Sequence, residues 1–187
     1  MNGIWCNILC TYKLFTCFSM QRNRTGERLP LWCTELIFVH ADGECFVPPV
    51  MVHHCNYYTH DIYYNIPSYW LVHHSLLGYM DLNECLKSMS HLSPMCCYPP
   101  LNHQVLLCDG YEIHFDNRAF SILWRNHIQS FILKSGDSVH NHPNYSGPIL
   151  NLNNMYGNSR MNCMSKHRTI KFTLTHMNSI LVETWNF

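Results

Sequence analysis

Runs of apolar residues alternate along the chain with short polar segments that contain glycine, proline or asparagine. Period-two and uninterrupted apolar runs predict strands at 4–18, 32–40, 45–53, 104–108 and 128–133. Helical spacing and capping residues predict helices at 82–91, 117–127, 149–159 and 175–185, whereas 21–30, 54–74, 93–101 and 134–148 are predicted loops. Strands followed by interspersed helices predict a mixed α/β fold.

The first half of the chain contains a predicted antiparallel hairpin. Its two strands, 32–40 and 45–53, flank the turn Ala41-Asp42-Gly43-Glu44. Pro48 and Pro49 cannot donate ladder hydrogen bonds, so the second strand is expected at a sheet edge or at a bulge.

Asp109 follows the most continuous apolar strand, Gln104-Val105-Leu106-Leu107-Cys108, and is itself followed by Gly110. An uninterrupted apolar run predicts a strand buried on both faces, and Asp-Gly ends it with a turn. Asp109 is therefore expected at the carboxyl end of a buried strand, where ligands and metals bind in open α/β sheets. The alternative interpretation is that Asp109 caps the turn or the next helix.

Two further aspartates are predicted helix caps. Asp81 precedes the helix 82–91 and has Glu84 at the capping-box position. Asp116 precedes the helix 117–127, whose predicted apolar face comprises Phe120, Leu123 and Trp124.

Composition restricts the class of protein. A chain of 187 residues with 47% hydrophobic residues is long enough for one domain with a core. Formal net charge is zero and charged residues are 13%, which excludes a strong basic field or an acidic tail. Eleven cysteines without a Cys-x-x-Cys pair indicate buried thiols in a reducing compartment. No apolar run reaches the ~18 residues of a membrane span, and no basic segment precedes an apolar one, so neither insertion nor secretion is expected.

Two local patterns suggest other chemistry. Histidine, cysteine and aspartate gather at His53, His54, Cys55, His60 and Asp61, but no second ligand pair follows at zinc-finger spacing. The interpretation as surface or core residues is therefore favoured over a structural zinc site.

Gly136-Asp137-Ser138 is similar to the nucleophile turn of lipase-type esterases. Such enzymes also need a downstream acid and histidine, and Glu183 is the only later acid in the chain. A hydrolase is therefore disfavoured.

Basic residues form two clusters that favour either nucleic-acid contact or a solvated face. They are Arg22, Arg24 and Arg28, and then Arg160, Lys166, His167, Arg168 and Lys171.

The order of several segments resembles the catalytic domain of DDE-type transposases of the mariner/pogo superfamily, especially pogo/Tigger-like DDE endonucleases. The similar segments are 34–43 with Pro48 to Val52, Leu77-Gly78-Tyr79-Met80-Asp81, 105–114, 131–138, 142–148 and 175–185. Within 105–114, Leu106, Leu107, Asp109, Gly110 and His114 match the signature Leu-Leu-x-Asp-Gly-His-x-Ser-His, whereas Ile113 replaces its serine. The resemblance covers residues 30–187.

The resemblance implies an RNase H-like mixed sheet with helices on both faces. Three carboxylates in that family bind two divalent metals, which activate water or a 3′-hydroxyl and stabilise the leaving oxygen. Asp109 matches the second acid and is the expected metal ligand, and Asp137 is the candidate replacement for the third acid, whose aligned position is Tyr145. No acid precedes Glu27, so the first acid is missing, and the domain is expected to lack its first, central strand.

The resulting interpretation has two segments, a diverged N-terminal segment 1–30 and a partial DDE transposase RNase H-like domain 31–187. The leading hypothesis is a catalytically degenerate, transposase-derived domain with residual nucleic-acid binding. One alternative is an active DNA endonuclease that uses Mg²⁺ or Mn²⁺ at Asp109 and Asp137, and another is a drifted reading frame without a biochemical role. The resemblance implies DNA as the partner and the nucleus as the location.

Overall fold

The computed structural model describes residues 4–14, 31–40, 47–54, 63–96, 103–134, 148–166 and 174–185. Within these ranges the strands are β1 (Ile4–Leu14), β2 (Leu31–His40), β3 (Val50–His54), β4 (Leu71–Ser75), β5 (Gln104–Cys108) and β6 (Ile128–Ile132). The helices are α1 (Leu82–Cys96), the short 3-10 helix η2 (Glu112–Phe115), α2 (Asn117–Arg125), α4 (Pro148–Lys166) and α5 (Leu174–Trp185).

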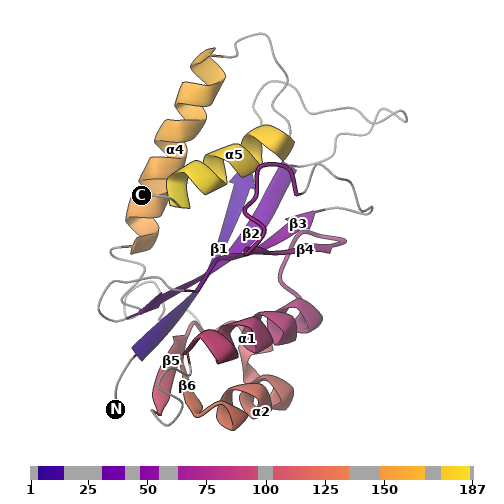
Figure 1. Cartoon of the computed structure of the whole chain (residues 1–187), viewed down its shortest axis with the longest axis vertical. Helices are drawn as coiled ribbons and strands as arrows, with labels where there is room; N and C mark the ends of the chain where they lie inside the picture. The colour runs from indigo at the N-terminus through magenta and orange to yellow at the C-terminus, as the bar shows by residue number, and fades with distance from the viewer. Residues whose placement is uncertain are drawn as a thin grey trace.

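The strands form one mixed sheet in the order β4-β3-β2-β1-β5-β6 (Figure 1). The β1–β2 and β2–β3 pairs are antiparallel, whereas the β1–β5, β5–β6 and β3–β4 pairs are parallel. Helices α4 and α5 lie on one side of this sheet, and α1 and α2 lie on the other. The predicted mixed sheet with flanking helices is confirmed.

The expectation of a missing central strand is wrong. β1 lies between β2 and β5, pairing with β2 from Trp5↔His40 to Leu14↔Leu31 and with β5 at Ile4↔Val105 through Cys6↔Leu107. Without β1, β2 and β5 would each expose an unpaired row of backbone donors and acceptors. The prediction of a boundary near residue 30 stays a prediction, although β1 belongs to the same sheet as the segments that follow it.

The predicted antiparallel pairing of the two hairpin strands is confirmed, whereas the predicted turn 41–44 lies outside the described residues, and the second strand is not at an edge. β3 begins at Val50, directly after Pro49, and pairs on its outer side with β4. The prolines therefore precede the ladder, so their missing N–H groups interrupt no strand. β4 itself was predicted as part of a loop. The polar residues His73 and His74 interrupt the apolar pattern that predicts a strand in the sequence. The segment forms a strand because it hydrogen-bonds to its parallel neighbour β3.

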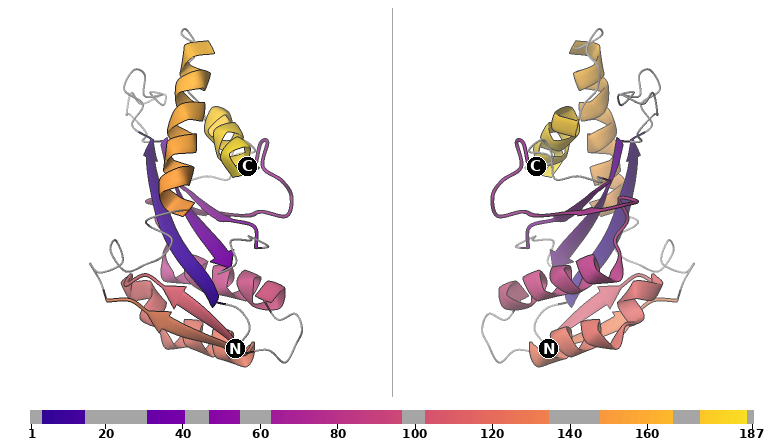
Figure 2. Two further views of the ribbon diagram at one scale, coloured as in Figure 1. Left: turned by 90° about the vertical axis from the view of Figure 1, so that its left-hand side faces the viewer. Right: turned by 90° about the vertical axis from the view of Figure 1, so that its right-hand side faces the viewer.

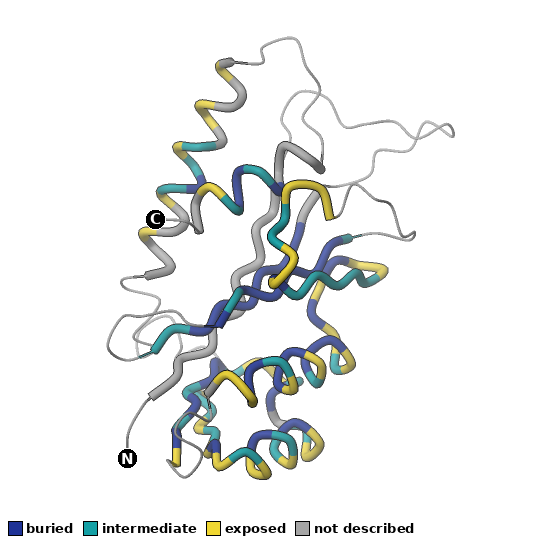
Figure 3. The backbone as a smooth tube through the Cα atoms, viewed as in Figure 1, coloured by how far each residue is buried: buried dark blue, intermediate teal, exposed yellow. Residues whose placement is uncertain are grey.

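The main core fills the space between the sheet and the helices α1 and α2. Fourteen buried residues form this cluster, among them Leu36 and Phe38 of β2, Met89 of α1, Leu106 of β5 and Leu123 of α2. Figure 3 shows the corresponding buried stretches along the sheet and on the inner sides of these helices. Alternation along each strand places the same face of β2, β3 and β5 against this cluster.

The opposite face of the sheet is covered by α4 and α5 (Figure 2). It presents Cys33 and Ile37 of β2 and Met51 of β3, all buried, and the helices contribute buried Tyr156, Ile180 and Leu181. β5 is less completely covered here, because Val105 and Leu107 are only half-buried. The prediction of a strand buried on both faces is therefore wrong in part.

Two helices differ from their predictions in extent or orientation. α1 continues to Cys96 through Pro94, although the segment from Ser93 onward was predicted to break it. Buried Met89 and Leu92 pack the turn of the helix before Pro94 into the core, and this tertiary packing holds the helix in place despite the local cost of proline. In α2, Leu123 is buried as expected, but Trp124 is 73% exposed.

The other elements follow the sequence closely. β5, β6 and α5 lie where they were predicted, and α4 is longer than expected because it extends to Lys166. Both predicted caps are present. Asp116 Oδ1 accepts the Arg118 N–H at 2.8 Å, and Asp81 Oδ1 accepts the Glu84 N–H at 3.0 Å.

We expect the Asp81→Ala substitution to lower the free energy of unfolding by about 1 kcal/mol, because one N-terminal N–H of α1 then loses its acceptor. Chemical denaturation of parent and variant measures the difference. Ser90→Ala is the control, since Ser90 lies mid-helix, is exposed and only bonds back to the Leu86 carbonyl. Equal losses in the two variants would show that Asp81 contributes nothing as a cap.

Candidate functional site

Asp109 lies directly after β5 and is 7% exposed. Its Oδ1 atom is 3.0 Å from His114 Nδ1 and accepts the Tyr111 N–H at 3.4 Å. The His114 side chain, on η2, is 1% exposed. The Asp109 carboxylate is thus tied to the turn that follows it, as the capping alternative anticipated, and it also has a buried imidazole partner.

His114 was not among the predicted site residues. Its ring is also 3.3 Å from the Asp109 carbonyl through Nδ1, whereas its buried Nε2 has no hydrogen-bond partner. The signal that could have identified it is its spacing, five residues after Asp109, at the final histidine of the signature. A 3-10 turn between them brings the two side chains together.

Other carboxylates influence the region around Asp109. Burial raises the pKa of Cys85, and together with the nearby carboxylates of Asp116, Asp109 and Asp81 it brings this pKa to about 12. Burial also raises the pKa of Tyr111, with contributions from Glu112, Asp109 and Asp81. The Cys85 thiol therefore stays protonated at neutral pH, so it does not act as a nucleophile. The shifts indicate a locally negative potential where the first turns of α1 and α2 approach the end of β5.

The residues that the structure describes do not fit a two-metal centre. Among them, no group of three or more His, Cys, Asp or Glu side chains is arranged to hold a metal ion. The sequences of β1 and α4 contain no Asp or Glu, and Asp137 lies outside the described residues. Asp109 alone supplies too few ligands, because a pair of Mg²⁺ ions needs several oxygen ligands from different strands and helices.

The predicted histidine-rich cluster is only partly described. His53 is wholly buried on β3, neither of its ring nitrogens has a hydrogen-bond partner, and burial lowers its pKa to about 4. Cys55, His60 and Asp61 lie outside the described residues. His53 therefore behaves as a neutral core histidine.

Glu35 is a buried carboxyl group that sequence analysis did not single out. It lies on β2, on the face covered by α4 and α5, with Cys33 two positions away and His53 directly across from Cys33. Burial raises the pKa of Glu35 to about 8, and it raises the pKa of Cys33 well above its usual range, with a further contribution from Glu35. This face of the sheet therefore buries three titratable groups in their uncharged forms at mildly acidic pH.

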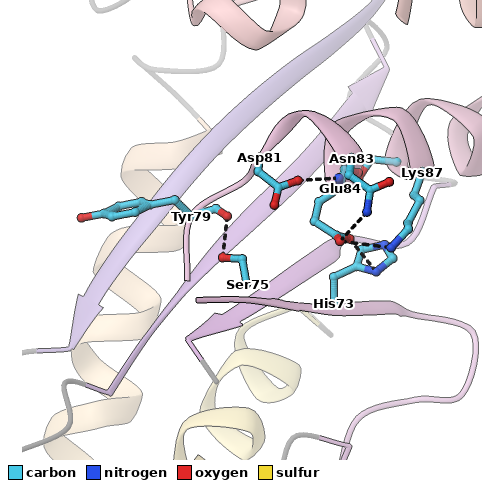
Figure 4. A network of polar contacts seen from close by, with 8 residues as sticks. His73, Ser75, Tyr79, Asp81, Asn83, Glu84 and Lys87 are labelled. Atoms are coloured by element: carbon cyan, nitrogen blue, oxygen red, sulfur yellow. Dashed lines mark hydrogen bonds and ion pairs between the residues drawn. The ribbon is translucent and has the colours of Figure 1, made fainter. Parts of the chain in front are cut away.

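A polar network joins β4 to α1 (Figure 4). Glu84 is buried, its Oε2 lies 2.8 Å from His73 Nδ1, and its Oε1 accepts from Lys87 Nζ at 3.1 Å. Burial lowers the pKa of His73, and the Glu84 carboxylate opposes that shift. Glu84 thus pairs with a strand and with its own helix, which identifies the network as a structural connection between α1 and the sheet edge.

The remaining candidate residues are mostly outside the described part of the chain. This applies to Arg22, Arg24, Arg28, Ser138, His167, Arg168 and Lys171, whereas Arg160 and Lys166 belong to α4. Among the described residues, no helix is long and apolar enough to cross a membrane.

Comparisons with known proteins concern the fold. No protein-family model matches the sequence, and no curated protein matches it. One similar solved structure is a chain from the cryo-electron microscopy structure of the simian T-cell lymphotropic virus intasome in complex with PP2A regulatory subunit B56 gamma. The match has a TM-score of 0.48 and 10% identity, and it covers 98% of this chain and 47% of that chain. This chain thus spans about half the length of the chain it matches, and its fold is defined by its own strand order and directions.

Proposed function

We propose that this protein is a nucleic-acid-binding domain derived from a DDE-type transposase of the mariner/pogo superfamily, with a degenerate catalytic centre. The observation that carries the proposal is the position of Asp109. It stands at the end of β5, next to a central strand β1 whose sequence contains no carboxylate. Under this proposal, β1 takes the place of the central strand on which the family carries its first acid, and its sequence contains no acid.

The arrangement of the sheet supports the relationship. The mixed sheet and the helices on both of its faces are the RNase H-like features that the resemblance implied. The Asp109–His114 pair joins the first acidic residue and the last histidine of the signature segment. DNA as the ligand and a nuclear location remain part of this proposal.

The test measures binding and cleavage of the same labelled DNA by the full chain in the presence of Mn²⁺. We expect DNA to be retained with equal affinity by the parent and by Asp109→Ala, and neither protein to nick it, because one carboxylate cannot hold two metals. Asp116→Ala is a matched control, since Asp116 is a carboxylate that caps α2 and pairs with the exposed Arg118 side chain.

Two outcomes would overturn the proposal. Nicking that disappears in Asp109→Ala but persists in Asp116→Ala would establish an active metal-dependent endonuclease. A protein that melts without cooperativity and binds no DNA would correspond to a drifted sequence without biochemical function. The melt is recorded with and without Mn²⁺, because a ligand at ~100 times its dissociation constant adds roughly 2.7 kcal/mol to the unfolding free energy.

A further inference from the structure

A groove of about 450 Å³ lies between the connection from β4 to α1 and the segment that follows Asp109. Its lining is mainly apolar with one carboxylate, and includes Leu76, Leu77, Tyr79, Asp81, Tyr111 and Ile113. Four of these side chains are large, apolar and exposed: Leu76 by 72%, Leu77 by 64%, Tyr79 by 37% and Tyr111 by 38%. A contiguous exposed apolar surface of this kind marks an interaction site more often than a chance feature.

The first wall of the groove is held rigidly. Gly78 has a φ of 68°, a conformation that favours glycine, and its carbonyl accepts the buried Thr34 hydroxyl at 2.7 Å. The Ser75 hydroxyl donates to the Tyr79 carbonyl at 2.8 Å, and in Figure 4 the Tyr79 ring points away from this bond. The turn that carries Leu76 and Leu77 is therefore fixed to β2 before any ligand arrives.

The second wall is held by the buried pair described above. The contact between Asp109 and His114 fixes the ends of the segment that joins them. Tyr111 and Ile113 of this segment line the groove. Because both walls are fixed by buried hydrogen bonds, binding requires little ordering of the protein, which favours affinity.

The charge around the groove has one sign. Asp81 lines it, and Glu112 is exposed next to Tyr111. Burial raises the pKa of the Tyr111 hydroxyl, and Glu112, Asp109 and Asp81 raise it further. The described lining residues include no lysine or arginine. A nucleic-acid backbone would be repelled here, whereas a cationic ligand with apolar groups would be attracted.

We propose that this groove binds a peptide segment of a protein partner in which lysine or arginine residues alternate with large apolar residues. The apolar side chains of the segment pack between Leu76, Leu77 and Ile113. Its cationic side chains contact Asp81 and Glu112 and lie against the tyrosine rings, where cation–π attraction adds to the ion pairing.

The probe is a short fluorescein-labelled peptide in which leucine and lysine alternate, and the readout is fluorescence anisotropy with the full chain. We expect the Leu76→Ser/Leu77→Ser double variant to weaken binding about tenfold or more, since it removes the apolar anchors. We expect Glu112→Lys to weaken binding about threefold or more and to reduce its dependence on salt. Both changes are at exposed positions, so the fold is retained and the thermal melt checks this.

Trp124→Ser is the matched control, because Trp124 is the most exposed aromatic side chain of the described residues and lies on α2. We expect it to leave peptide binding unchanged, and a peptide of alternating leucine and glutamate to bind no variant. Three results would overturn the proposal: equal affinity of parent and double variant, peptide binding indifferent to Glu112→Lys, or displacement of the peptide by a single-stranded oligonucleotide. The last result would assign the groove to nucleic acid.

Discussion

Glu35→Gln is expected to make the protein more stable than the parent at pH 8 and to remove the contribution of Glu35 to the pH dependence of stability between pH 4.5 and 8. The folded state holds the Glu35 carboxyl protonated up to a pKa of about 8, whereas its ordinary value is 4.5. Over that window the unfolded chain releases a proton that the folded chain keeps at Glu35, so the contribution of Glu35 to the unfolding free energy falls as pH rises. The full loss is on the order of 3–5 kcal/mol.

Denaturation at several pH values between 4 and 9 measures the effect. Below pH 4.5, parent and Glu35→Gln should approach similar stabilities, because the carboxyl group becomes protonated in both the folded and the unfolded state. Glu112→Gln is the control, since this carboxylate is exposed and its removal should leave the slope of the parent unchanged. A difference in stability between parent and Glu35→Gln that does not grow as pH rises from 4.5 to 8 would contradict the buried neutral state of Glu35.

His53 should impose the opposite slope at acidic pH. Its folded-state pKa is about 4 and its ordinary value is 6.5, so the unfolded chain takes up a proton first as pH falls. The stability that its neutral form contributes is complete above pH 6.5 and is lost as pH falls toward 4. The two groups on the α4/α5 face therefore place the pH of greatest stability between about 4.5 and 6.5.

Phe38→Ala is expected to destabilise the protein by about 3–5 kcal/mol, which is a large part of the stability of a domain of this size. Phe38 is fully buried on β2 and belongs to the cluster that joins the sheet to α1 and α2. Removing its ring leaves a cavity that the surrounding Leu36 and Leu106 cannot fill without moving strands. The midpoint of chemical denaturation, at constant m-value, measures the loss.

Trp124→Ala is the control for Phe38→Ala. The tryptophan ring is larger, but it is 73% exposed, so its removal should change the unfolding free energy by no more than about 0.5 kcal/mol. Losses of the same size in both variants would mean that α2 packs through Trp124, as the helical pattern of the sequence predicted.

Asp109 shows why a single buried carboxylate does not make an active centre. The strand β5 and the dipeptide Asp109-Gly110 hold the carboxylate at the carboxyl end of a strand inside the sheet. The second requirement, further oxygens from other elements, is not met by the described residues. His114 instead binds one carboxylate oxygen from within the same turn. The geometry therefore favours a structural role for Asp109 under the proposed function.

The sequence by itself determined the features that depend on neighbouring residues. The apolar run before Asp109 predicted β5, and Asp81 and Asp116 predicted the starts of α1 and α2, because strand periodicity and capping are local properties. The hairpin of β2 and β3 was predictable for the same reason.

The tertiary structure alone decided the features that depend on distant partners. β1 is the central strand because β2 and β5 leave a row of backbone groups that only a strand between them can satisfy, and β4 is a strand because β3 offers it an edge. Packing of the helices against distant segments also decides that α1 continues through Pro94 and that Trp124 is exposed to solvent. Glu35 and His53 are buried for the same reason, since helices from the far end of the chain cover their face of the sheet. No local pattern encodes such partners, because the free energy of these contacts arises only when distant segments meet.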